Sequence, residues 1–368
     1  MDFNTKDNMK YLLIDGNNLG VRCSFANSSL RSKDDLPSGV HYGTFNSLFS
    51  LKQYFPDYQF FIAWDGKSKK RMAEAREAVN RGIVPSGYKD NREKDLEKMR
   101  PELKDFYQQA PFLQRAINEL GIPQIRWQDF EADDIIASYV KLLSKDNEIV
   151  IVTSDEDYFQ LLKYDVSIWD GRKQKTTTKK TWEDETGITS HQHIDVGALM
   201  GDDGDNIFGV PGIGDKTAIK EIKKYGTWQK VLEAYKAKFS DARKSFPDLK
   251  DPLLIKDGYD PKQVFEDMKN KKSEKGKFIY PEINFNMPYT GVLSAFDKEI
   301  LKVKASKTEI MALMFEERIR LAYTLKKMDE DIPNLPEINK LSFNKDRVLE
   351  YFKYYDINTL DESIYLFE

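Results

Sequence analysis

This 368-residue sequence has little cysteine, little histidine and no long hydrophobic run. Its single cysteine, Cys23, cannot form a disulfide within the chain, which fits a reducing cytoplasm. We find neither an N-terminal apolar run of the signal-peptide type nor a stretch long enough to span a membrane, so we expect neither export nor a membrane span. The histidines number three, and His191 and His193 fall in an expected polar loop, so we do not expect a histidine metal site.

The chain also lacks a surplus of positive charge. Its net charge is −4, which taken alone argues against a nucleic-acid partner. The basic residues are unevenly distributed, however, because residues 66–100 contain eleven Lys or Arg and six Asp or Glu, a local charge of +5. A nucleic acid therefore stays among the expected binding partners.

Short apolar runs that end in acidic residues recur along the chain: "YLLID" at 11–15, "QFFIAWD" at 59–65 and "EIVIVTSDED" at 148–157. Helix-length segments separate these expected strands, which predicts βαβ units. The predicted fold class is therefore α/β, with a mainly parallel central sheet flanked by helices. Ligands bind at the carboxyl ends of the strands in such sheets, and three strands deliver acids to that edge.

A further acidic motif, "FEADDIIASYV" at 130–140, predicts a helix that begins near Glu131. Taken alone, these acids suit the helix dipole, and an aspartate after a strand is more often a turn residue than a ligand. The joint occurrence of the motifs favours a shared site. The carboxylates that would converge are Asp15, Asp65, Glu131, Asp133, Asp134, Asp155, Asp157, Asp202 and Asp205.

A cluster of carboxylates must be protonated, solvated or neutralised, because the charges repel one another. Oxygen ligands without histidine or cysteine favour Mg²⁺ or Mn²⁺ over zinc. A carboxylate-held pair of divalent ions is suited to the hydrolysis of a phosphodiester, because one ion activates water and both stabilise the transition state.

A glycine-punctuated turn follows the last acids in "GDDGDNIFGVPGIGDKTA" at 201–218. Gly209, Gly212 and Gly214 can bring backbone N–H groups close to a phosphate, and Lys216 and Thr217 open a helix whose dipole favours an anion. The pattern predicts a hairpin between two helices that grips a nucleic-acid backbone. A plain helix–helix turn is the alternative.

Asp15, "AWDGK", "YKDNR", "EADD", "TSDED" and the 201–218 stretch occur in the order and spacing of the flap endonuclease / 5′-nuclease family. The chain resembles its bacterial and bacteriophage members, including the 5′-nuclease domain of bacterial DNA polymerase I, over roughly residues 10–240. The resemblance implies a mixed sheet with a helical arch and a helix–hairpin–helix DNA clamp. It also implies two-metal cleavage of 5′ flaps and 5′ ends of DNA, in replication and repair, with the nine carboxylates above as ligands.

The resemblance further assigns roles to the basic segment. Lys89 would contact the scissile phosphate with Arg92 as its partner, and Arg71 would contact DNA. Tyr88 would stack on a base, although a packed tyrosine is an equal alternative. A solvated charged helix suits residues 73–81, and the spacing from Asp65 to Tyr88 is longer than in phage relatives.

The expected cofactors are two or more Mg²⁺ ions, for which Mn²⁺ can substitute, and a potassium ion held at the hairpin. We expect the following domains: a nuclease core at 1–190 with the arch at 66–108, a helix–hairpin–helix region at 191–265, and a C-terminal helical extension of unknown role at 266–368. Residues 267–277 read as a linker, and residues 309–325 show helical periodicity. The tail could pack on the core, bind a partner or shape specificity.

The expected partners are DNA with a 5′ flap, nick or free 5′ end, together with replication proteins. We expect a stand-alone, monomeric nuclease in the cytoplasm of a bacterial cell or a virus-infected bacterium. Two alternatives stay open. A non-catalytic, structure-specific DNA-binding protein predicts a depleted acidic set, and a PIN-type ribonuclease would be shorter and lack both arch and hairpin.

Overall fold

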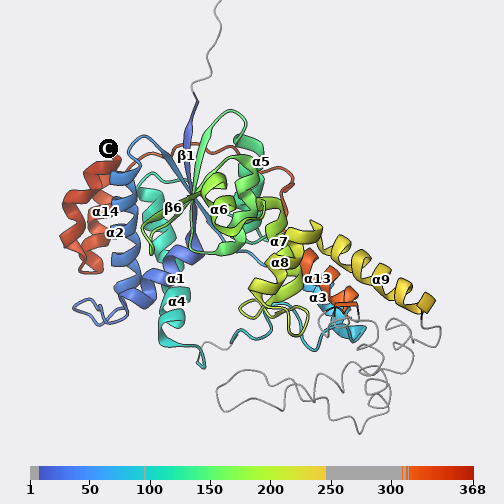
Figure 1. The fold of residues 1–368 in the computed structure, drawn as a ribbon. Helices are drawn as coiled ribbons and strands as arrows, with labels where there is room; N and C mark the ends of the chain where they lie inside the picture. Colours follow the sequence, from blue (N-terminus) through green and yellow to red (C-terminus); the bar gives the residue numbers. More distant parts are fainter. Residues whose placement is uncertain (1–7, 95–96, 246–308, 310–311, 314) are drawn as a thin grey trace, which may run out of the picture. The chain divides into compact units, whose positions relative to one another are not determined.

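The computed structural model describes residues 8–94, 97–245, 309, 312–313 and 315–368 (Figure 1). The chain divides into two compact units. The first, which we call the sheet unit, comprises Met1–Lys69, Glu93–Glu185 and Met328–Glu368. The second, the helical unit, comprises Lys70–Arg92 and Thr186–Lys327. The domain boundaries expected from the sequence stay predictions.

The sheet unit is built on six strands in the order β3-β2-β1-β4-β5-β6 (Figure 1). All neighbouring pairs are parallel except the last, β5 with β6. The predicted α/β class with a mainly parallel sheet is therefore confirmed. The strands are β1 (Lys10–Asp15), β2 (Gln59–Trp64), β3 (Gln124–Arg126), β4 (Glu148–Val152), β5 (Ser167–Asp170) and β6 (Lys175–Thr178).

Helices cover both faces of this sheet, which explains why its central strands are almost wholly apolar. Alternate residues of a strand point to opposite faces. Accordingly, Leu12 joins a core formed with α1 (Gly16–Ala26), α2 (Gly39–Tyr54) and α4 (Pro101–Glu119). On the other face Phe61 packs edge-on against Tyr139 of α5 (Ala132–Leu143), with ring centroids 4.8 Å apart. The 3₁₀ segment η1 (Glu156–Tyr164) and the helix α6 (Lys179–Thr186) complete the first part of the unit.

The C-terminal residues belong to the same core. Phe352 of α14 (Lys345–Tyr354) is fully buried and meets Phe45 of α2 edge-on at 4.9 Å. The Tyr351 hydroxyl lies 2.6 Å from Nδ1 of the buried His41. The final segment η4 (Asn358–Phe367) packs against α2. Residues 345–367 thus pack on the core, and the other roles considered for the tail stay predictions.

The helical unit contains α7 (His193–Met200), which packs against α8 (Asp215–Tyr225), α9 (Trp228–Ser245) and α13 (Glu316–Lys326). A short antiparallel pair, β7 (Gly201–Asp202) and β8 (Ile207–Phe208), lies between α7 and α8 in sequence. The helix α13 covers the C-terminal part of the helix predicted at 309–325. The expected linker at 267–277 lies outside the described residues.

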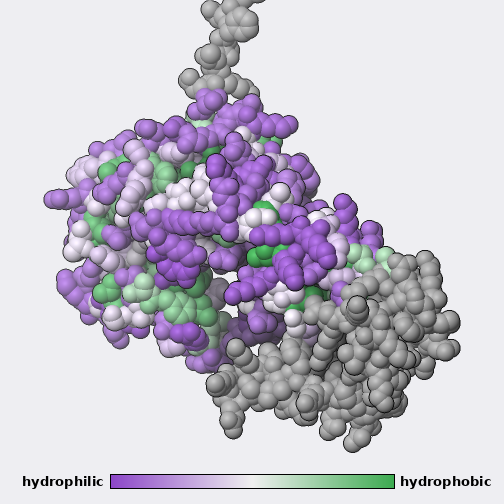
Figure 2. Space-filling view, viewed as in Figure 1, coloured by the Kyte–Doolittle hydropathy of each residue, from purple (hydrophilic) through white to green (hydrophobic). Residues whose placement is uncertain are grey.

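The basic segment at 66–100 contains one helix, α3 (Lys69–Asn80), among its described residues. Residues 81–94 and 97–100 form turns, bends and irregular backbone, and α4 begins directly after the segment. None of the described helices has the length and apolar character of a membrane span. Figure 2, viewed as in Figure 1, shows hydrophilic side chains over most of the described surface. This agrees with the 32% of charged residues in the sequence.

Candidate active site

Asp15 ends the central strand β1 and caps the helix that follows it. Its Oδ1 accepts a hydrogen bond from the Asn18 backbone N–H at 2.9 Å, and its Oδ2 accepts one from the Tyr158 hydroxyl at 3.1 Å. Asp15 is 8% exposed. Capping explains the local conformation, yet the position also places a buried carboxylate at the carboxyl edge of the sheet.

The two strands that flank β1 deliver further carboxylates to this edge. Asp65 follows β2, and its Oδ1 accepts from the Ala132 N–H at 2.9 Å at the start of α5. Asp155 lies three residues past β4 and caps η1, accepting from the Asp157 N–H at 2.9 Å. Because β2, β1 and β4 are adjacent and parallel, their ends bring the three acids to one edge, as the sequence predicted.

The electrostatics of the edge show this convergence. Burial raises the pKa of Asp15 well above its usual range, and the neighbouring charges of Asp65 and Asp155 raise it further. Burial also raises the pKa of Tyr158, with additional contributions from the carboxylates of Asp15, Asp133, Asp155 and Asp65. The charges of four carboxylates thus act on one buried phenol. A cation that neutralises these carboxylates would be favoured at this edge.

Glu131 and Asp134 lie at the start of α5 and are buried. Asp134 Oδ2 accepts from the Glu131 N–H at 3.3 Å, as in a capping box, and its Oδ1 accepts from the Asp329 N–H at 2.7 Å. These contacts favour the helix-capping interpretation for Asp134. Metal ligation by Glu131 and Asp134 stays a prediction.

The carboxylates of the sheet unit fit a hard divalent cation by their chemistry, since every donor is an oxygen and the buried Asp15 is opposed by like charges. As the side chains of the described residues stand, no three His, Cys, Asp or Glu form a ready-made metal-ligand group. One oxygen of Asp65 and one of Asp155 are instead engaged by backbone N–H groups. A divalent ion would have to draw these carboxylates together.

Two asparagines that sequence reasoning missed hold the strand ends together. Asn17 Oδ1 accepts from the Asp65 N–H at 3.0 Å. Asn18 Oδ1 accepts from the backbone N–H and the hydroxyl of Ser154, at 3.1 and 3.0 Å. The sequence could have identified them, because two amide side chains come directly after a strand that ends in an acid, at the sheet edge where ligands bind. Asn17 and Asn18 are therefore positioning residues for Asp65 and the residue before Asp155.

Two further predicted ligands lie in the helical unit, where Asp202 ends β7 and Asp205 lies in the loop between β7 and β8. Asp202 Oδ1 accepts from the N–H groups of Gly204 at 2.8 Å and Asp205 at 3.3 Å, while its Oδ2 lies 2.8 Å from Lys326 Nζ. Burial raises the pKa of Asp202, but the charge and hydrogen bond of Lys326 and the N–H groups of Asp205 and Gly204 together outweigh it, so the net pKa lies below the usual range.

Asp205 is also paired with basic residues, and these come from the matched "YKDNR" motif. Lys89 Nζ lies 3.7 Å from Asp205 Oδ2, Arg92 bonds the other oxygen, and the Lys89 N–H donates to the Asp205 carbonyl at 2.9 Å. Lys89 adopts a left-handed backbone conformation with φ of 56°, which is uncommon outside glycine. The structure thus joins two motifs that lie over a hundred residues apart. The phosphate contacts of Lys89 and Arg92 stay predictions.

Two residues predicted to contact DNA are buried. Tyr88 is 8% exposed, packs with Ala75 and Leu325, and donates its hydroxyl to Asp205 Oδ2 at 3.1 Å, which favours the packed alternative. Arg71 is 4% exposed and donates to the Lys327 carbonyl at 3.4 Å. A DNA contact by either residue stays a prediction.

The hairpin has the form that a backbone clamp requires. Gly209 lies so close to Met200 that a side chain at 209 would clash with backbone. Gly212, with φ of 85°, and Gly214 face open space, and Lys216 is exposed at the start of α8. Gly212 and Gly214 therefore leave two backbone positions that a phosphate can approach. The contacts predicted for these residues and for Thr217 stay predictions.

The helix α13 supplies two buried cations that sequence reasoning missed. Lys326 pairs with Asp202, and Arg318 donates from an Nη atom to the Gly209 carbonyl at 3.2 Å while lying over the Phe315 ring at 4.4 Å. The signal was available: Arg318, Ala322 and Lys326 are spaced by four and share the apolar face of the helix.

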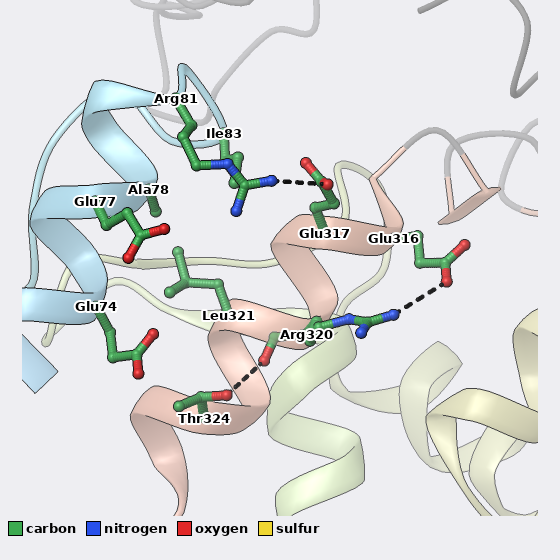
Figure 3. Close-up of a pocket in the computed structure, with 10 residues that line it drawn as sticks. All are labelled: Glu74, Glu77, Ala78, Arg81, Ile83, Glu316, Glu317, Arg320, Leu321 and Thr324. Carbon is green, nitrogen blue, oxygen red and sulfur yellow. Dashed lines mark hydrogen bonds and ion pairs between the residues drawn. The ribbon is translucent and has the colours of Figure 1, made fainter. Parts of the chain in front are cut away.

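A cavity of about 620 Å³ lies between α3 and α13 within the helical unit (Figure 3). Charged side chains line much of it, and they include the pairs Arg81–Glu317 at 3.0 Å and Arg320–Glu316 at 3.5 Å. None of the described residues that line this cavity is a predicted site residue.

The chain belongs to the 5′-3′ exonuclease family. Residues 10–187 match the 5′-3′ exonuclease N-terminal resolvase-like domain, and residues 188–257 match the C-terminal SAM fold. The 5′-3′ exonuclease of Bacillus subtilis is 34% identical over 235 residues, covering 62% of this chain and 74% of that protein. The thermostable DNA polymerase I of Thermus thermophilus is 31% identical over 225 residues, covering 61% of this chain. The chain spans 25% of that polymerase.

Solved structures show the same fold at lower identity. The T5 D15 protein co-crystallised with metal ions aligns with a TM-score of 0.53 and 18% identity, covering 97% of this chain and 99% of that one. The catalytic core of Rad2 in complex with DNA substrate aligns with a TM-score of 0.53 and 14% identity, covering 98% and 93%. The family model and the Bacillus relative thus confirm the predicted family, and the solved structures confirm the predicted fold.

Proposed function

We propose that this chain is a structure-specific 5′ nuclease that hydrolyses phosphodiesters at 5′ flaps and 5′ ends of DNA. The observation that carries the proposal is the convergence of Asp15, Asp65 and Asp155 at the ends of three adjacent strands, where their charges oppose one another. A non-catalytic DNA-binding protein would have no need for such mutually repelling carboxylates. Membership of the 5′-3′ exonuclease family supports the same conclusion and argues against the PIN-type alternative.

Divalent ions, Mg²⁺ with Mn²⁺ as a substitute, are the proposed cofactors. Bound ions would supply an activated water and charge stabilisation for phosphodiester hydrolysis. The proposed ligands are the nine predicted carboxylates. They are Asp15, Asp65, Glu131, Asp133, Asp134, Asp155 and Asp157 of the sheet unit and Asp202 and Asp205 of the helical unit. The T5 protein that shares this fold was co-crystallised with metal ions, which supports the proposal.

The basic residues and the hairpin are proposed to hold DNA through its phosphates. Lys89 and Arg92 are held side by side by their ion pairs with Asp205, and a DNA phosphate is their proposed ligand. Gly212, Gly214 and the exposed Lys216 present backbone and charge at the start of α8. Rad2, which shares the fold, has been solved with DNA substrate. Replication proteins remain proposed partners.

Cleavage of a panel of 5′-labelled substrates tests this proposal. The panel contains a 5′ flap, a nicked duplex, a blunt duplex and the single strand, each incubated with Mg²⁺, Mn²⁺ or EDTA. We expect cleavage of the flap and the 5′-ended duplexes with either metal and none in EDTA. Equal cleavage of all four DNAs, or cleavage that EDTA does not stop, would contradict a structure-specific, metal-dependent nuclease.

A further inference from the structure

The ion pair between Lys326 and Asp202 has a consequence for the metal-binding role proposed above, on which this inference rests. Lys326 lies on α13, beyond the matched family domains, which end at residue 257. Its side chain is 5% exposed, and its Nζ lies 2.8 Å from Asp202 Oδ2. The Asp202 side chain is 31% exposed, so the lysine end of the pair is buried while the carboxylate is still reached by solvent.

The surroundings are shaped to hold this lysine. α13 packs against α7, and a Cβ at Gly197 of α7 would come within 2.7 Å of Lys326 Cδ and Cε. The absence of a side chain at position 197 thus leaves the room through which the lysine stem reaches Asp202. The other oxygen of Asp202 is held by the N–H groups of Gly204 and Asp205. Both oxygens of this predicted ligand are therefore engaged within the protein.

A divalent ion that binds Asp202 Oδ2 must meet this ammonium group. If the ion displaces Nζ, a buried charge loses the carboxylate that compensates it, which is unfavourable. If the ion binds beside Nζ, the two positive charges repel each other, and water screens the buried ammonium group only in part. Either way, the lysine opposes the metal at this loop.

We propose that Lys326 is a positioning residue that acts as a built-in counter-ion for Asp202 and lowers the affinity of its loop for divalent ions in the DNA-free protein. Lys326 fixes the Asp202 carboxylate in place and offsets its charge. Metal binding at the loop is therefore unfavourable until further negative charge, such as a DNA phosphate, lies nearby. DNA binding and metal binding at this loop are then linked and reinforce each other.

Binding of Mn²⁺ to the free full-length protein, followed by electron paramagnetic resonance without DNA, tests this proposal. Lys326→Gln removes the charge and keeps a hydrogen-bond donor, Lys326→Met removes both, and Lys326→Arg keeps the charge. Lys236→Met is the matched control, because Lys236 pairs with Glu316 at 2.7 Å in the same unit. Asp202→Asn, made in the wild-type and Lys326→Gln backgrounds, identifies the Mn²⁺ that depends on Asp202.

We expect Lys326→Gln and Lys326→Met to bind the Asp202-dependent Mn²⁺ about tenfold or more tightly than wild type. Lys326→Arg and Lys236→Met should stay within about twofold. Thermal unfolding gives a second measurement, in which the neutral variants melt lower than wild type in EDTA and gain more from Mn²⁺. Unchanged or weaker binding by Lys326→Gln, with Asp202-dependent binding intact, would overturn this inference alone. If Asp202→Asn alters Mn²⁺ binding in neither background, the metal role of Asp202 is itself wrong.

Discussion

Replacing Asp65 with asparagine should stabilise the metal-free protein. After burial, the Asp65 charge is the largest cause of the raised Asp15 pKa. Two unit charges about 6 Å apart interact by about 3 kcal/mol at an effective dielectric of 20. Asp65 is partly exposed, and solvent screening reduces this energy, so we expect Asp65→Asn to add about 1–2 kcal/mol to the free energy of unfolding. The asparagine Oδ1 can still accept from the Ala132 N–H.

The pH dependence of this gain follows from the sign of the shift. The folded state holds the Asp15 proton more tightly than the unfolded state, so stability is lost as pH rises through the raised pKa. The gain from Asp65→Asn should therefore be largest at neutral and higher pH and shrink toward acid. Mg²⁺ should also reduce it, because a bound cation neutralises the repulsion that the substitution relieves.

Urea unfolding in EDTA at several pH values measures this effect, since the shift in midpoint multiplied by the m-value gives the change in free energy. Asp146→Asn is the control: Asp146 is an exposed carboxylate in the turn after α5, and its replacement should change stability by less than about 0.5 kcal/mol. If Asp65→Asn destabilises the protein at neutral pH in EDTA, the carboxylates do not oppose one another as described.

Three further substitutions test other parts of the molecule. Lys89→Ala should lower the single-turnover cleavage rate by roughly 10² to 10³, because its charge would act on the reacting phosphate. Lys94→Ala, in the same basic segment, should cost less than about tenfold, and equal effects would reduce the segment to a diffuse basic surface. Lys216→Ala should weaken duplex binding and lower the slope of log K against log salt by about one. A collapse of its single-turnover rate with affinity intact would contradict a remote clamp. Phe352→Ala should lower the free energy of unfolding by about 3–5 kcal/mol in urea denaturation, because the ring is fully buried against Phe45. A loss below about 1 kcal/mol would mean that the C-terminal helix is a detachable appendage.

The strand ends could be predicted from the sequence because local patterns determine them. An apolar run followed by an acid specifies a buried parallel strand, and Asp15, Asp65 and Asp155 lie at one edge because their strands are neighbours. The start of α5 was likewise readable, since Glu131 and Asp134 are three residues apart as in a capping box.

The ion pairs around the 201–208 loop could not be predicted, because they depend on contacts between segments far apart in sequence. Lys326 pairs with Asp202 across 124 positions, and the hydroxyl of Tyr88 reaches Asp205 across 117. Local pattern shows that a residue is basic or aromatic, but not which buried acid it meets. The packing of Phe352 into the hydrophobic core beside α2 is another such long-range contact.

Single-turnover cleavage of a 5′-labelled flap by wild type and Asp155→Ala, with flap affinity measured in parallel, tests the role of the acidic sheet edge. We expect Asp155→Ala to abolish cleavage in saturating Mg²⁺ and to leave flap affinity within about tenfold, because the basic segment and the hairpin still hold phosphates. Cleavage by Asp155→Ala at a rate near that of wild type would contradict the assignment of these carboxylates as the metal-binding centre of a 5′ nuclease.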